Sequence, residues 1–213
     1  MRAQRLGLAL FCVLVAASCA KTPVAPTVVN QGNPASSNSG SSSAPSTTAA
    51  VVDQGTPATY AWHAGDAFLA ALNPAFSPDV AEASNGDRIV IRGTGTLGIH
   101  PKSVTGGGTF THLSPTGAVL AAGTFRAVEL LSFVSYGPSS ATPPSFNSGK
   151  ALLRVLLFPG GAGSGIDAIF RIECTLPGGD VPNGLEEGIN LNVAGVANFN
   201  EQVSGNTVFI KTS

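Results

Sequence analysis

The chain is poor in cysteine. Of its three cysteines, Cys12 lies inside an apolar N-terminal run and Cys19 closes that run, which leaves Cys174 alone in the body of the chain. A single thiol cannot form an internal disulfide. The fold must therefore be stabilised by packing. The body of the chain from Thr59 onward has about 155 residues, and a domain of that length can bury most of the surface that its unfolded chain exposes.

The chain is also poor in charge. Charged residues make up 11% of the sequence, and the formal net charge is −1. Nucleic-acid-binding domains carry clustered basic side chains that displace counterions from phosphates, and this chain has no such cluster. Nucleic acid is therefore excluded as an expected partner.

Catalytic and cofactor motifs are missing as well. There is no Gly-x-Ser-x-Gly nucleophile, and the glycine runs 106–108 and 160–163 lack the Lys-Ser/Thr of a phosphate loop, so we expect turns there. The histidines have no close metal-ligand spacing; they are His63, His100 and His112. We expect no cofactor and no metal, the remaining route to a metal site being convergence of His100, His112 and Glu129 across neighbouring strands.

The first residues of the chain have the pattern expected of an export signal. A basic tip precedes the uncharged run from Leu6 to Ala17. The run has about a dozen residues, whereas a membrane-spanning helix needs about 20. The triplet Ala16-Ala17-Ser18 before Cys19 resembles the lipobox of bacterial lipoproteins. The resemblance implies that residues 1–18 are removed and that Cys19 carries fatty acid; the alternative is cleavage after Ala20, which releases a soluble secreted protein.

Residues 19–58 are predicted to be a flexible tether. From Thr22 to Val52 there is no charged residue, and Ser, Pro, Ala, Asn, Gly and Thr dominate. Such a segment has too little bulky apolar surface to offset the entropy of ordering it. We expect an exported protein in the cell envelope, bound to the membrane on its extracytoplasmic side through Cys19, with one folded domain at 59–213.

Short strand signals separated by Gly, Pro, Ser or Asn fill most of that domain. They cover residues 88–92, 96–100, 108–112, 119–128, 129–136, 151–158, 166–175, 188–193 and 207–211. The one helix signal is 66–72, with Asp66 as its cap and Pro74 ending it. The sequence predicts an all-β fold: a single antiparallel β-barrel or β-sandwich of about eight to ten strands.

Local patterns add detail to this prediction. Ser114-Pro115-Thr116-Gly117 fits a tight turn that pairs residues 111–113 with 119–125 in a hairpin, as in a meander. The period of two in residues 169–174 places Cys174 on a packed face and Arg171 and Glu173 on a solvent-exposed face. Residues 128–134 and 152–158 are apolar on both faces, which predicts burial on both sides.

The motifs GGGTFTH and ELLSF, with a late EGI and NF, resemble a secreted β-domain of bacteria and fungi that has no assigned activity. The architecture is similar to the small antiparallel barrels of allene oxide cyclases and dirigent proteins. Fold alone does not imply function.

Polar residues that interrupt apolar strands are the candidate site. Glu129, Arg154 and His112 would meet in a low-dielectric interior if their faces line one cavity, with His100 as a further member. The structural alternative is an ion pair between Glu129 and Arg154. The neighbouring acids Glu186 and Glu187 are predicted to be exposed, or to point to opposite faces, and give little support to a glycosidase-like pair.

These observations favour a non-enzymatic binding module for a small molecule, a glycan or a protein partner. The alternative is a small-barrel enzyme, isomerase-like or cyclase-like, with Glu129 and His112 as acid and base. A structural role in the envelope is the third hypothesis.

Overall fold

The computed structural model describes residues 56–213, which form an all-β domain. Cys19, the signal segment and most of the tether lie outside these residues. The elements are β1 (Thr59–Ala64), α1 (Ala67–Leu72), the 3₁₀ turn η1 (Pro74–Phe76), β2 (Asp79–Ala83), β3 (Arg88–Gly98), β4 (Ser103–Leu113), β5 (Val119–Pro138), β6 (Phe146–Pro159), β7 (Ile166–Cys174), β8 (Gly188–Val193), β9 (Ala197–Ser204) and β10 (Thr207–Lys211). Among the residues described, no helix is long and apolar enough to cross a membrane.

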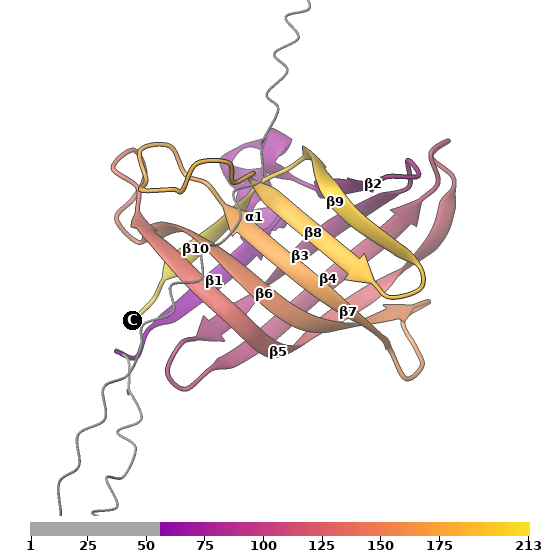
Figure 1. The fold of residues 1–213 in the computed structure, drawn as a ribbon, viewed down its shortest axis with the longest axis horizontal. Helices are drawn as coiled ribbons and strands as arrows, with labels where there is room; N and C mark the ends of the chain where they lie inside the picture. The colour runs from indigo at the N-terminus through magenta and orange to yellow at the C-terminus, as the bar shows by residue number, and fades with distance from the viewer. Residues whose placement is uncertain (1–55) are drawn as a thin grey trace, which may run out of the picture. The chain divides into compact units, whose positions relative to one another are not determined.

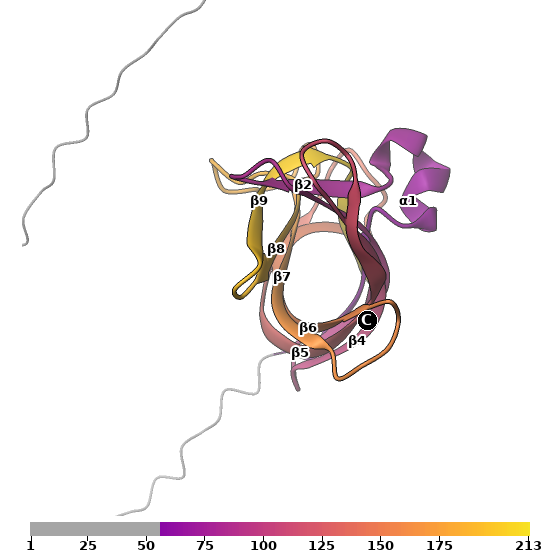
Figure 2. The same cartoon turned by 90° about the vertical axis from the view of Figure 1, so that its right-hand side faces the viewer.

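The ten strands form one antiparallel sheet that partly closes into a ring (Figures 1 and 2). Each strand from β3 to β8 pairs with the next one along the chain, as the meander predicts. The ring closes because β9 pairs with β2 and β2 pairs with β3. The terminal strands β1 and β10 pair with each other and attach to β3 and β6.

Two strand edges are shared, and each shared edge creates a fork. One edge of β3 pairs with β2 over residues 88–91 and with β1 over residues 93–98. One edge of β6 pairs with β10 at residues 146–147 and with β7 over residues 149–157. We call these the β1/β2 fork and the β7/β10 fork. At a fork two strands separate, so backbone groups lose their ladder partners and need others.

Strand prediction succeeded where the local signal was strong. β8 and β10 begin and end at the predicted residues. β3 is one strand where two were predicted, at 88–92 and 96–100, and β5 is one strand where two were predicted, at 119–128 and 129–136. The strands β1, β2 and β9 were not predicted. For β2 (DVAEA) and β9 (ANFNEQVS) the reason is composition, because Ala, Asp, Glu and Asn are poor strand formers.

The predicted helix cap and hairpin are confirmed. The carboxylate of Asp66 accepts a hydrogen bond from the Leu69 amide at 3.1 Å, and Pro74 begins η1 directly after α1. In the hairpin, the Gly117 amide donates to the Ser114 carbonyl at 2.9 Å, and Gly117 has a φ of +85°. This turn joins β4 to β5, as predicted.

Large side chains fill the interior of the ring. The ring of Phe170 lies 6.4 Å from that of Trp62 and 5.5 Å from that of Phe125, measured between centroids. These three side chains are buried, so the space inside the ribbon of Figure 2 is packed with aromatic groups. Cys174 is also fully buried, which confirms its predicted place on the packed face.

Three predictions about strand faces are wrong. β-Bulges at 127–129 and 130–132 shift the alternation of β5, so Glu129 and Val134 are exposed although burial on both faces was expected. In β6 only the inward face is fully buried, and Arg154 on the other face is exposed. Glu173 is buried and not solvent-exposed as predicted, and Lys150 and Arg171, at 3.9 and 3.5 Å from its carboxylate, offset the cost of burying the charge.

Candidate functional site

An apolar pocket lies between α1 and the strands at the end of the domain where β7 finishes and β10 begins. Its cavity volume is about 480 Å³. Its walls come from four separate segments: α1 with η1, the β5–β6 loop, the β7–β8 loop and the start of β10. The apolar side chains of these walls include Leu69, Leu72, Phe76, Phe146, Leu176 and Val208. We call this cavity the α1 pocket.

Four polar side chains line the same pocket: Thr142, Glu187, Asn206 and Thr207. Glu187 spans the β7/β10 fork. One of its oxygens accepts hydrogen bonds from the Thr175 amide and hydroxyl, and the other accepts from the Thr207 amide at 2.7 Å and lies 3.0 Å from the Thr207 hydroxyl. The carboxylate thus replaces the ladder bonds that are lost where the strands separate.

Of the two alternatives predicted for the neighbouring acids, exposure of both is wrong: Glu186 is exposed, whereas Glu187 is partly buried and lines the pocket, so the two side chains point to different surroundings. Burial raises the pKa of Glu187, and the hydrogen bonds from Thr175 and Thr207 oppose that effect. A carboxyl group with a perturbed pKa in an apolar cavity is typical of a functional site. No sequence signal marked Glu187, because its partners lie in β10 and at the end of β7.

A second acid, Asp79, is buried at the β1/β2 fork. Burial raises its pKa to about 7; a hydrogen bond from Gln202 at 3.0 Å opposes this rise, and the nearby charge of Glu187 adds to it. The Oδ2 atom of Asp79 has no hydrogen-bond partner among the described residues. In the described part of the chain, no basic side chain forms an ion pair with Asp79 or Glu187.

Close backbone packing surrounds Asp79. Gly65 has a φ of +54°, and a Cβ atom added there would lie 2.1 Å from the Asp79 amide nitrogen. Gly205 approaches from the other side, where a Cβ atom would lie 2.4 Å from the Asp79 Cα. Only glycine fits at these two positions, so the fork holds Asp79 in a fixed, dry environment.

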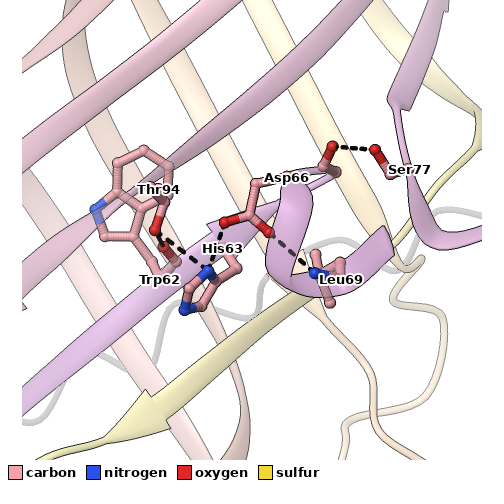
Figure 3. Close-up of polar contacts among 7 residues, drawn as sticks. Trp62, His63, Asp66, Leu69, Ser77 and Thr94 are labelled. Atoms are coloured by element: carbon pink, nitrogen blue, oxygen red, sulfur yellow. Dashed lines mark hydrogen bonds and ion pairs between the residues drawn. The ribbon is translucent and has the colours of Figure 1, made fainter. Parts of the chain in front are cut away.

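A polar network fixes α1 against the barrel (Figure 3). His63 Nδ1 lies 2.6 Å from Asp66 Oδ2 and 3.2 Å from the Thr94 hydroxyl. The His63 ring also stacks on Phe68 of α1, with centroids 4.5 Å apart. The Ser77 hydroxyl donates to the Gly65 carbonyl at 2.6 Å, which ties the far end of η1 to the end of β1. This network positions the helical wall of the α1 pocket.

A smaller cavity lies at the opposite end of the barrel, where β4 ends and β5 begins. It has a volume of about 60 Å³ and mostly aliphatic and aromatic walls, with His112 as its ionisable group. His112 Nε2 lies 3.1 Å from Asp87 Oδ2, and the His112 ring contacts Phe199 edge to face. We call it the barrel-mouth pocket.

The structure places two of the predicted site residues beside each other but does not bring all four together. Glu129 and Arg154 are opposite one another on β5 and β6, yet both are exposed, and Arg154 pairs with Asp167 at 2.7 Å. The expected ion pair between Glu129 and Arg154 is therefore absent from the described residues. The interior cluster is wrong because the β5 bulge and the outward face of β6 direct these side chains to solvent.

The two histidines of that cluster are also separated from Glu129. His100 is exposed in the turn between β3 and β4. His112 is opposite Ala121 of β5, eight residues from Glu129, which corresponds to roughly 25 Å of extended strand. Within residues 56–213, no group of three or more His, Cys, Asp or Glu side chains is placed to hold a metal ion.

Cys174 lies close to the buried acids but is not a reactive thiol. Burial raises its pKa well above the ordinary value, and the charge of Glu187 raises it further. A thiol in this environment stays protonated and has no path to solvent.

Comparison of the chain with protein-family models, with curated proteins and with solved structures gave no match.

Proposed function

We propose that this domain is a non-enzymatic binding module that takes up a small, largely apolar molecule in the α1 pocket. The observation that carries the proposal is the pocket itself: a cavity of about 480 Å³ with apolar walls and a few polar side chains. Pockets of this size and composition are typical of small-molecule sites. A small molecule is favoured over a glycan or a protein partner because the apolar surface is concave.

The lipoprotein interpretation gives the module its location. A fatty-acylated Cys19 would hold the chain at the membrane outside the cytoplasm, and the uncharged segment from Thr22 to Val52 would act as a tether of roughly 30 Å. The domain would then meet its ligand at the cell surface or in the envelope.

Fluorescence of N-phenyl-1-naphthylamine, a neutral probe that brightens in apolar surroundings, tests the pocket. Leu72 lines the pocket and is 54% exposed, so Leu72→Gln should weaken probe binding without unfolding the domain. Loss of about 1 kcal/mol of apolar contact corresponds to a roughly fivefold rise in Kd.

Leu120→Gln is the matched control. Leu120 is 56% exposed, and it lies at the opposite end of the domain at the start of β5. The probe should bind this variant as it binds the wild-type chain. Equal weakening by both substitutions, or no probe binding to the wild-type chain, would overturn the proposed function.

A second candidate function uses the barrel-mouth pocket. The isomerase-like or cyclase-like alternative keeps His112 as the base, but Asp87 replaces Glu129 as its carboxylate partner, since Asp87 lies 3.1 Å from His112. Such an enzyme would exchange carbon-bound protons of small enones with ²H₂O. Exchange that is lost in His112→Gln and kept in His100→Gln would support this function.

A further inference from the structure

The acids beside the α1 pocket have no cationic partner among the described residues. Glu187 lines the pocket, Asp79 is close enough for their charges to interact, and no described Lys, Arg or His lines the cavity. A buried carboxylate without a counter-charge is unfavourable. The interaction free energy between such a carboxylate and a cation in the pocket is therefore larger than it would be in water. The local charge therefore discriminates between ligands of opposite sign.

Two polar side chains of the pocket lining also have hydrogen-bond acceptors that a ligand could use. The Thr142 hydroxyl oxygen is fully buried and has no partner within residues 56–213. Asn206 also lines the pocket; its backbone N–H donates to the Phe76 carbonyl at 3.1 Å and its backbone carbonyl accepts from the Gly65 amide at 3.0 Å, which leaves its side-chain amide for other partners. Both oxygens are available to a ligand that brings its own donors.

Glu187 keeps one acceptor position open. A carboxylate accepts about four hydrogen bonds, and three donors are the Thr175 amide, the Thr175 hydroxyl and the Thr207 amide. The Thr207 hydroxyl has a single proton, which it donates to the Glu173 carbonyl at 2.7 Å, closer than its 3.0 Å contact with Glu187. One lone pair on Glu187 Oε1 is therefore left without a donor.

We propose that the α1 pocket selects apolar ligands that carry a cationic ammonium head group over neutral or anionic ligands of the same chain length. An ammonium group supplies both a positive charge and three N–H donors. Glu187, Thr142 and Asn206 provide acceptors for these donors. This inference rests on the proposed function of the pocket and specifies its ligand class.

Competition against N-phenyl-1-naphthylamine tests the selectivity. The competitors are n-octylamine, n-octanol and n-octanoate, which share one apolar chain and differ in head-group charge. At pH 8, above the pKa of Asp79, octylamine should displace the probe at a concentration at least tenfold lower than octanoate, with octanol between them. The wild-type order alone decides the proposal if a variant fails to fold.

Glu187→Gln removes the charge that lines the pocket while Asp79 keeps its own, so the octylamine affinity should fall toward that of octanol, and the octanol affinity should change little. Glu186→Gln is the matched control, because it changes the net charge equally at the adjacent, exposed position. Glu186→Gln should keep the wild-type order.

The outcomes separate the two proposals. Equal displacement by all three competitors, or loss of selectivity in Glu186→Gln as large as in Glu187→Gln, overturns the ammonium preference while the binding function stands. Absence of probe binding overturns the binding function itself. An octanoate preference would refute the charge argument directly.

Discussion

Replacement of Asp79 by asparagine should make the domain more stable at alkaline pH. Asp79 is fully buried, and burial raises its pKa from the ordinary value of 3.8 to about 7. Each tenfold change in proton affinity is worth about 1.4 kcal/mol, so ionisation of Asp79 in the folded domain costs about 4 kcal/mol. The side-chain carbonyl of the introduced asparagine can still accept the hydrogen bond that Gln202 donates to Asp79.

The sign of the effect follows from proton linkage. Below pH 3.8 both the folded and the unfolded chain bind this proton. Between pH 3.8 and about 7 the folded chain keeps the proton while the unfolded chain loses it, so the free energy of unfolding falls as the pH rises. Above pH 7 the carboxylate is ionised in both states, and the full cost of about 4 kcal/mol remains.

Urea unfolding at pH 4.5, 6 and 8 measures this dependence, with fluorescence of the single, buried Trp62 as the signal. Asp79→Asn should be more stable than the wild-type chain by about 1 kcal/mol at pH 4.5, where the unfolded chain has begun to lose the proton, and by up to about 4 kcal/mol at pH 8. Asp180→Asn, outside the buried fork, should follow the wild-type curve. If Asp79→Asn retains the wild-type pH dependence or is the less stable at pH 8, the reasoning fails.

Three further predictions concern packing, the helix and the anchor. Gly117→Ala should lower the free energy of unfolding in urea by roughly 1–2 kcal/mol, and Gly65→Ala should lower it several times more. Both glycines have a positive φ, but only at Gly65 would the added Cβ atom meet backbone atoms of Asp79. Asp66→Ala should destabilise the domain by about 1 kcal/mol through loss of the helix cap, and should weaken probe binding because α1 forms a wall of the pocket. Cys19→Ser should move the protein from the membrane to the soluble fraction, and intact-mass analysis of the mature wild-type chain should show fatty acid on Cys19; an unacylated chain that stays at the membrane would contradict the lipoprotein interpretation.

Predictions that depend on neighbouring residues agree with the structure. The cap at Asp66 and the turn at residues 114–117 each involve atoms within a few positions along the chain. The inward position of Cys174 follows from the period of two in a strand without bulges. In each case a local geometric rule is sufficient.

Predictions that assumed an uninterrupted alternation were less successful. The bulges of β5 move Glu129 to the outside, where a straight strand would have aligned it with the inward-facing residues. Arg154 was expected to pair with Glu129, but Asp167 across the other edge of β6 is its partner. A bulge depends on both paired strands, so the sequence of one strand does not reveal it.

The sequence by itself determined a helix-poor domain of short strands and closely spaced turns, because these are properties of short segments. Only the tertiary structure decided where the buried acids and the α1 pocket lie. Gln202 and Asp79 are 123 residues apart, and Glu187 contacts strands on both sides of a fork. Asp79 is buried where the ring closes through β2 and β9, whose own sequences are weak strand signals, and Glu187 is held between the end of β7 and the start of β10. Closure of a sheet is a property of the whole chain, and it places the α1 pocket and its two acids where no local pattern marks them.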